Sequence, residues 1–214
     1  MSKIEVYFVN HHRPNKFPWS IYHAPLLNGL EKFLKSINGI ESKHVLVVGP
    51  GDLQEIDMLI DLGFRISVAD IDQRTLQFLK SKNYPIENYY LVTSGYKGYP
   101  DLKFDAIYAK EVIEHIVDDQ IFLSKMYELL KANGRLWLST PNYGFFLLPL
   151  LEVTILELIA RLSGFSRLGI HPNKFNVSKL EEHLHDAGFK QINSEITFLR
   201  LAIWSTGGKL DSSN

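Results

Sequence analysis

The stretch VLVVGPGDLQEIDMLIDLGFRISVADID, residues 45–72, decides the fold of this 214-residue chain. An apolar run ends in Gly-Pro-Gly at 49–51, a helix-like segment follows over 53–63, and a second apolar run ends at Asp70. Both runs are rich in β-branched residues, as expected for parallel strands buried on both faces. The segment between them has apolar residues at helical spacing and closes on a glycine, which predicts a helix.

The same alternation of strands and helices continues along the chain. Further strands are predicted at 89–93, 104–110 and 135–140, and further helices at 73–82 and 118–131. Helix-linked strands require right-handed crossovers, so we expect an α/β fold with an open parallel sheet and helices on both faces. Near the C-terminus, the pattern predicts a helix that is capped by Ser178 and ended by Gly188. Two closing strands, expected to be antiparallel, then follow within 191–206.

Composition narrows the class of protein. The net charge of −1, the pI near 6.7 and the lack of a Lys/Arg run disfavour nucleic acid as a partner. The chain has no cysteine, which excludes disulfides, thiolate metal sites and cysteine nucleophiles and fits a cytoplasmic location. With no break in composition, we expect a single domain over 1–214, and the polar N-terminus does not resemble a secretory signal.

One apolar stretch, residues 143–165, needs testing as a membrane span. A spanning helix requires about 20 nearly uninterrupted apolar residues. Pro149, Glu152, Glu157 and Arg161 interrupt this run. The stretch therefore predicts an amphipathic helix and no transmembrane span.

The carboxyl ends of the first two strands predict a nucleotide site. Ligands of open α/β sheets bind beyond these strand ends. Gly49 and Gly51 allow a tight turn and a close approach of the backbone to a ligand. Asp70 lies 19 residues after Gly51, about the spacing at which an acid reaches the ribose hydroxyls of an adenosine cofactor. The alternative is a tight turn beside an unrelated acid.

Four motifs together resemble the class I S-adenosylmethionine-dependent methyltransferases over residues 26–206. They are VLVVGPG, ISVADID, FDAIYAKEVIEHI and LLKANGRLWLSTPN. The resemblance implies a Rossmann-like, doubly wound sheet of seven strands, mostly parallel with an antiparallel last strand. It also implies S-adenosylmethionine as cofactor and places these residues in its site: Gly49, Pro50, Gly51, Asp70, Ile71, Ser94, Gly95 and Lys110.

The chain departs from the family pattern at three positions. Val47 replaces the acid that usually precedes the first glycine, and Leu53 replaces the third glycine. The acid of the third strand is missing, and Ser94 is the nearest polar residue. Each loss removes a hydrogen bond worth on the order of 1 kcal/mol. A catalytically degenerate binding protein with this fold therefore remains an alternative, whereas a nicotinamide enzyme is disfavoured because its fingerprint needs the third glycine.

Glu111, Glu114 and His115 follow the fourth strand and are the candidate catalytic residues. Histidine suits proton removal near neutral pH, so His115 is the candidate general base. The E-x-x-E-H segment, the Ser-Thr-Pro-Asn turn and the apolar insertion are similar to those of ubiquinone-pathway O-methyltransferases. This resemblance implies O-methylation of a small, partly apolar acceptor. An N-methyltransferase, which would tolerate loss of His115, is the alternative.

The same three side chains could instead hold a divalent metal ion, a role that we do not favour. They would share one face if the segment were helical. In a purely structural interpretation, His115 packs at a helix start and the two glutamates face water.

By the same resemblance, two segments are expected to build the acceptor pocket: an N-terminal lid or helix region over 1–40 and an insertion over 143–177. The candidate substrate-binding residues in them are Trp19, His23, Tyr143, Phe146 and His171. The apolar part of the insertion would also suit a peripheral membrane contact or a homodimer contact. Ordinary packing of these histidines and aromatic residues is the alternative.

Overall fold

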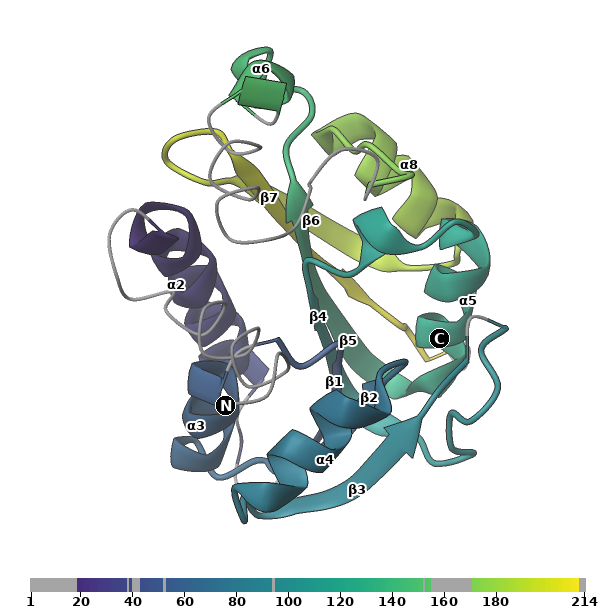
Figure 1. Cartoon of the computed structure of the whole chain (residues 1–214). Helices are drawn as coiled ribbons and strands as arrows, with labels where there is room; N and C mark the ends of the chain where they lie inside the picture. Colours follow the sequence, from purple (N-terminus) through teal and green to yellow (C-terminus); the bar gives the residue numbers. More distant parts are fainter. Residues whose placement is uncertain are drawn as a thin grey trace.

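The computed structural model describes residues 19–37, 39, 43–51, 53–93, 95–151, 153–154 and 171–211. These residues form a seven-stranded sheet in the order β3-β2-β1-β4-β5-β7-β6 (Figure 1). The strands from β3 to β5 are parallel, and β7 is antiparallel to both of its neighbours. Their bounds are β1 His44–Val48, β2 Arg65–Asp70, β3 Ile86–Leu91, β4 Phe104–Lys110, β5 Leu130–Pro141, β6 Lys190–Ile196 and β7 Ala202–Gly208. The predicted α/β class and the closing antiparallel hairpin are confirmed.

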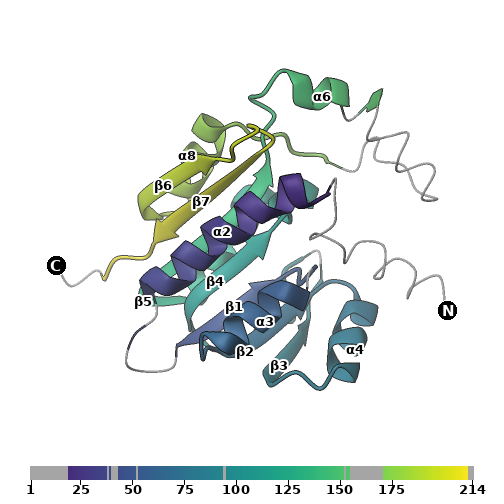
Figure 2. The same cartoon turned by 90° about the vertical axis from the view of Figure 1, so that its left-hand side faces the viewer.

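Helices cover both faces of the sheet (Figure 2). The helices α2 (Trp19–Ile37), α3 (Leu53–Asp61) and α4 (Gln73–Ser81) pack on one face, where they share a core with Val45, Val47 and Tyr108. The helices α5 (Asp119–Leu129) and α8 (Val177–Asp186) pack on the other face around Leu46, Ile107 and Leu138. Neighbouring strand residues thus serve opposite cores, which explains why the central strands are apolar throughout.

The close packing of α2 on the sheet positions the N-terminal part of that helix. Trp137 of β5 stacks between Tyr108 and Trp204, which come from the two strands beside β5. Gly29 of α2 lies against the Trp204 indole, because a Cβ at this glycine would be only 2.8 Å from Nε1. A larger residue would push α2 off the sheet. The helix therefore lies close enough for Tyr22, two turns earlier, to reach the end of β4.

Several predicted boundaries were wrong. The third strand spans Ile86–Leu91 and not 89–93, because it is the edge strand and its polar start, with Glu87 bound to Arg65, has no apolar signature. The fifth strand begins at Leu130 and not at 135, because β4 also pairs with its earlier part: Phe104 pairs with Leu130 and, after a register shift, Ala106 pairs with Arg135.

The helix α8 begins earlier than predicted. Asn176, and not Ser178, is its N-cap, and the Asn176 side chain accepts a hydrogen bond of 2.9 Å from the Lys179 amide. Asparagine is as effective at this position as serine, so the two candidates could not be separated by residue type.

The predicted amphipathic helix over 143–165 lies largely outside the described residues. Within them, only the short helix α6 (Leu147–Leu151) and residues 153–154 fall in this stretch. Among the helices that the structure describes, none has the length and apolar character that crossing a membrane requires.

Candidate active site

The glycine turn after β1 is shaped by its contact with the segment after β4. Gly49 has φ +65°, a conformation that side chains other than glycine rarely adopt, and its amide donates to the Ala69 carbonyl at 2.9 Å. A Cβ at Gly49 would lie 2.6 Å from Cγ2 of Val112. At Gly51, by contrast, a Cβ would meet only the Gly49 carbonyl oxygen, at 3.9 Å. The turn is therefore closed toward the protein and open on its outer side, where Gly51 is exposed.

Asp70 ends β2 beside this turn, since Val48 pairs with Ala69 in the adjoining strands. Its Oδ1 accepts a hydrogen bond of 2.7 Å from the Asp72 amide. Burial raises the pKa of the Asp70 carboxyl, and the backbone hydrogen bonds and the neighbouring Asp72 charge modify it less. A ligand that donates hydrogen bonds to the ionised Asp70 carboxylate would lower this pKa again.

Other predicted cofactor residues lie around the same edge. Ile71 is 70% exposed, and Gly95 lies in an exposed turn after β3. Ser94 lies outside the described residues. Tyr99, which the sequence interpretation missed, packs on the core below this edge, and burial raises its pKa, with smaller contributions from Tyr96 and Asp70. It follows no strand directly, so no motif pointed to it.

Lys110, the last residue of β4, forms a buried ion pair with Glu55 in the first turn of α3. The side chains of Lys110 and Glu55 are only 8% and 1% exposed. Desolvation of two such charges is costly, and their mutual attraction offsets that cost only when they are in direct contact. Lys110 was predicted as a cofactor residue. Glu55 was not predicted, because one acid in a helix looks like an ordinary surface position.

Glu111 follows Lys110 and turns toward α2. Its Oε2 accepts a hydrogen bond of 2.5 Å from the Tyr22 hydroxyl, and its Oε1 accepts one of 3.0 Å from the Ser139 hydroxyl. The residue has φ +55°, which is unusual for a side chain of this size and redirects it from the path of the strand. Burial raises the pKa of Glu111, while the two hydroxyls and the charges of Lys110 and His171 lower it.

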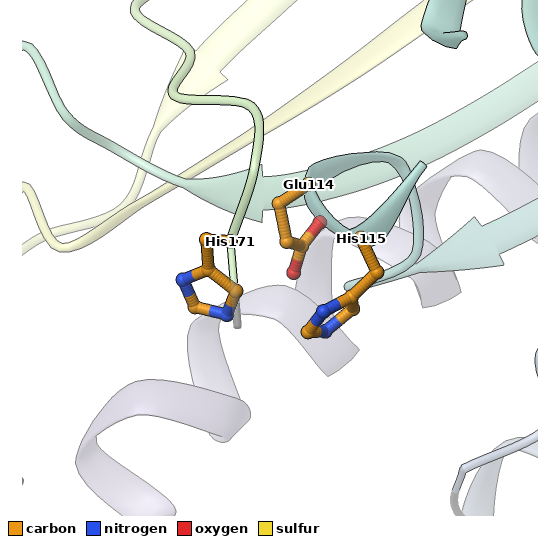
Figure 3. Close-up of side chains that lie close together, drawn as sticks. All are labelled: Glu114, His115 and His171. Atoms are coloured by element: carbon orange, nitrogen blue, oxygen red, sulfur yellow. The ribbon is translucent and has the colours of Figure 1, made fainter. Parts of the chain in front are cut away.

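Glu114, His115 and His171 form a second polar group at this edge (Figure 3). Glu114 and His115 belong to the 3-10 turn η1 (Ile113–His115), whereas His171 comes from the segment before α8. One donor atom from each side chain lies within 4.8 Å of the others. The His115 and His171 ring centroids are also 4.8 Å apart. Glu114 is buried and His115 is exposed, so the group connects the interior with the surface.

The segment that carries His171 is fixed to the η1 turn. The Asn173 amide donates to the Glu114 carbonyl at 3.3 Å, and Asn173 Nδ2 donates to the Ile116 carbonyl at 2.5 Å. Nδ1 of His171 is 2.6 Å from the Tyr143 hydroxyl. These contacts orient the His171 ring before any ligand binds, which reduces the cost of using it.

The predicted helical face shared by Glu111, Glu114 and His115 was wrong. The positive φ of Glu111 and the 3-10 turn send Glu111 to α2 and the other two toward His171. A carboxylate and two imidazoles are a donor set that can hold a divalent metal ion. Among the described residues, the set assembled for this is Glu114, His115 and His171, not the set expected from the sequence.

The predicted acceptor residues come from α2 and from the segment between β5 and α8. Tyr143 contacts His171, and Lys174 lies over the Tyr143 ring at 5.3 Å. His23 is half-buried on α2, with its ring edge-on to Tyr22. Phe146 is 79% exposed just before α6. Trp19 begins α2, but its side chain, like residues 1–18, lies outside the described part of the chain.

Comparison with known proteins decides the family. A methyltransferase domain model matches residues 19–194, which is most of the chain. The chain belongs to the class I S-adenosylmethionine-dependent methyltransferases. The glycine turn and the strand-end acid lie at the carboxyl edge of the sheet, where ligands of open α/β sheets bind.

Curated relatives and solved structures agree with this assignment. The chain is 28% identical over 190 residues to a ubiquinone biosynthesis O-methyltransferase of Rhodopseudomonas palustris, covering 86% of this chain and 72% of that protein. It is 28% identical to the enzyme of the same name from Bradyrhizobium diazoefficiens, covering 61% of this chain and 53% of that protein. The chain thus spans about half the length of some curated relatives that it matches.

The fold also matches a Burkholderia thailandensis N1-methyltransferase solved with bound 1,6-didemethyltoxoflavin and S-adenosylhomocysteine. The TM-score is 0.65 at 16% identity, and the match covers 98% of this chain and 89% of that structure. This likeness concerns the fold alone.

Proposed function

We propose that this methyltransferase transfers the methyl group of S-adenosylmethionine to an oxygen of a small, partly apolar acceptor, with His115 as general base. The observation that carries the proposal is the group of Glu114, His115 and His171 at the carboxyl end of β4. It lies at the edge of the sheet where the glycine turn and Asp70 lie. Acceptor and cofactor can therefore meet between the two groups.

The residues present fit the cofactor. The open outer side of Gly51 accepts the methionine part, and Asp70 accepts hydrogen bonds from the ribose hydroxyls. When bound, the cofactor supplies an electrophilic methyl group. The protein needs to align the acceptor with this group and to remove its proton.

Proton removal falls to His115 because it is the accessible member of its group. The buried Glu114 carboxylate stabilises the imidazolium that forms on His115, in the way that a buried acid supports a catalytic histidine in other enzymes. His171, held by Tyr143, binds the acceptor hydroxyl and orients it toward His115. No metal ion is needed in this scheme, because the imidazole alone supplies the base.

The acceptor's apolar part packs against the segment around α6, where Phe146, Leu147 and Leu150 are exposed. The names of the curated relatives favour a phenol or quinol with an apolar substituent. A peripheral membrane contact or a homodimer through the same side chains stays a prediction, as does the cytoplasmic location.

A second candidate is N-methylation of a small molecule. The Burkholderia N1-methyltransferase, whose fold the chain shares, is an example of this fold acting on a nitrogen acceptor. A neutral amine needs no strong base, so this activity would survive the loss of His115.

The test compares two phenolic acceptors of different acidity in wild type and His115→Gln. For a catechol that is protonated at neutral pH, turnover should fall by roughly 10²–10⁴-fold in the variant, the usual range for loss of a general base. For a nitrocatechol that is already ionised, turnover should fall by less than about ten-fold, since no proton has to be removed.

The matched control is His185→Gln, an exposed histidine at the end of α8 that is paired with Asp186. It should leave both rates unchanged. Equal losses for the two acceptors in His115→Gln would reduce His115 to a packing or binding role. Full activity on an amine acceptor in that variant would favour the N-methyltransferase.

A further inference from the structure

The buried polar residues around the end of β4 form one electrostatic unit, which we call the β4-end cluster: Tyr22, Glu55, Lys110, Glu111 and Ser139. Four elements contribute to it, namely α2, α3, β4 and β5. Lys110 contacts Glu55, and Glu111 accepts hydrogen bonds from the two hydroxyls. The charge of Lys110 also lowers the pKa of Glu111, which links the two halves of the cluster.

The charges of the cluster do not cancel. The Lys110 ammonium and the Glu55 carboxylate compensate each other, so the ionised Glu111 carboxylate leaves one negative charge over. Two neutral hydroxyls support that charge but do not neutralise it. The charges of Lys110 and His171 lower the pKa of Glu111, but burial is the largest influence on this pKa and raises it, so ionisation of Glu111 remains costly. A positively charged ligand beside this cluster would add a favourable partner.

The cluster lies next to the glycine turn of the cofactor site. Val48, which precedes Gly49, pairs with Ala109, so Lys110, the last residue of β4, and Glu111, which follows it, continue alongside the turn. The Glu111 amide donates to the Ser139 carbonyl at 3.1 Å and fixes the start of the β4 exit. Val112, one residue further, is the side chain in contact with Gly49. A cofactor held at this turn would therefore lie beside the β4-end cluster.

We propose that the β4-end cluster, through Glu111, makes the cofactor site selective for charge, so that it favours the cationic sulfonium of S-adenosylmethionine over the neutral thioether of S-adenosylhomocysteine. Methyl transfer removes the positive charge, and the product then loses its electrostatic partner. The same cluster thus holds the cofactor before transfer and favours release of the product after it. Glu111 is then a cofactor-selectivity residue and not the base.

The inference rests on the cofactor and not on the identity of the acceptor, so it is tested by binding alone. Calorimetry would measure the dissociation constants of S-adenosylmethionine, S-adenosylhomocysteine and sinefungin, an analogue in which an amine-bearing carbon replaces the methylsulfonium. In Glu111→Gln, affinity for the two cationic ligands should fall about ten-fold, on the order of one charge pair at a partly buried site. Affinity for S-adenosylhomocysteine should change by less than about two-fold.

Two further variants keep the result interpretable. Glu31→Gln removes the same charge on α2, where Glu31 is paired with Lys35 at the surface, and should leave all three constants unchanged. Tyr22→Phe keeps Glu111 but removes one hydrogen bond to its ionised form, and should produce a smaller loss for the cationic ligands only. If thermal unfolding shows that Glu111→Gln does not fold, the dissociation constants of Tyr22→Phe provide the test.

A selective loss for the cationic ligands in Glu111→Gln or Tyr22→Phe supports the inference. Equal losses for all three ligands would show that Glu111 acts only by holding α2 in place, and the inference would be wrong. Unchanged constants for all three would also overturn it. Because no acceptor is present, either outcome leaves the proposed role of His115 to its own test.

Discussion

Asp70→Asn isolates the contribution of one negative charge to cofactor binding. The asparagine side chain would keep an oxygen to accept the 2.7 Å hydrogen bond from the Asp72 amide, so the local backbone should not change. What is lost is a charged acceptor for the ribose hydroxyls. Hydrogen bonds to charged groups contribute about 1.5–3 kcal/mol against about 0.5–1.5 kcal/mol for neutral ones. We therefore expect affinity to fall by roughly 1–3 kcal/mol, or about 5- to 150-fold.

The stability of Asp70→Asn should change in the opposite direction. Burial raises the pKa of Asp70 in the folded protein, which means that ionisation of this carboxyl costs folding free energy. That cost is absent below the pKa of the unfolded chain and develops as pH rises through the folded pKa. At neutral pH the variant, which cannot ionise, should be at least as stable as wild type. Thermal unfolding measured at neutral pH and in mild acid checks the sign.

The assay is calorimetric titration with S-adenosylhomocysteine, with Asp72→Asn as control. Asp72 is the N-cap of α4 and accepts from the Arg74 amide, and asparagine caps equally well. The control removes a charge two residues away and should bind normally. Normal binding by Asp70→Asn would remove Asp70 from the site. Weaker binding accompanied by a lower unfolding temperature would point to a structural defect instead.

Three other predictions concern the same edge of the sheet. Gly49→Ala should lower the unfolding temperature and weaken cofactor binding, because the positive φ costs about 1–2 kcal/mol and the new Cβ meets Val112; Gly51→Ala, with space for its Cβ, should unfold like wild type. Tyr143→Phe should reduce turnover about ten-fold while leaving calorimetric cofactor affinity unchanged, since it loses only the hydrogen bond to His171. Affinity for S-adenosylmethionine should rise with pH, because Glu111, whose pKa is raised, loses its proton. Affinity for S-adenosylhomocysteine should not rise in this way. The same pH dependence of affinity for both ligands would contradict this prediction.

The central strands could be predicted because their burial on both faces selects apolar residues at most positions. In β1, β2 and β4, neighbouring residues serve two different cores, so the strands read as continuous apolar runs. The edge strand β3 gave a weaker signal, since most of its residues are exposed or half-buried. Its start was misplaced for that reason.

The candidate site was harder to predict because its arrangement depends on backbone conformations that the residue types do not reveal. The residue types around Glu111 do not indicate a positive φ. This one backbone angle directs the Glu111 side chain away from those of Glu114 and His115. Glu55 became part of the site only through a contact with Lys110, which is 55 residues away in the chain. His171 was proposed from the resemblance to a family with an insertion, and its pairing with Tyr143 needed the fold.

The measurement that tests the central claim most directly follows a labelled methyl group. The protein would be incubated with S-adenosylmethionine that carries a deuterated methyl group and with an acceptor that bears both a phenolic hydroxyl and an aromatic amine. Mass spectrometry with fragmentation would locate the label. We expect the label on oxygen, with the yield strongly reduced in His115→Gln. Label on nitrogen, with the same yield in wild type and variant, would contradict the proposed O-methylation.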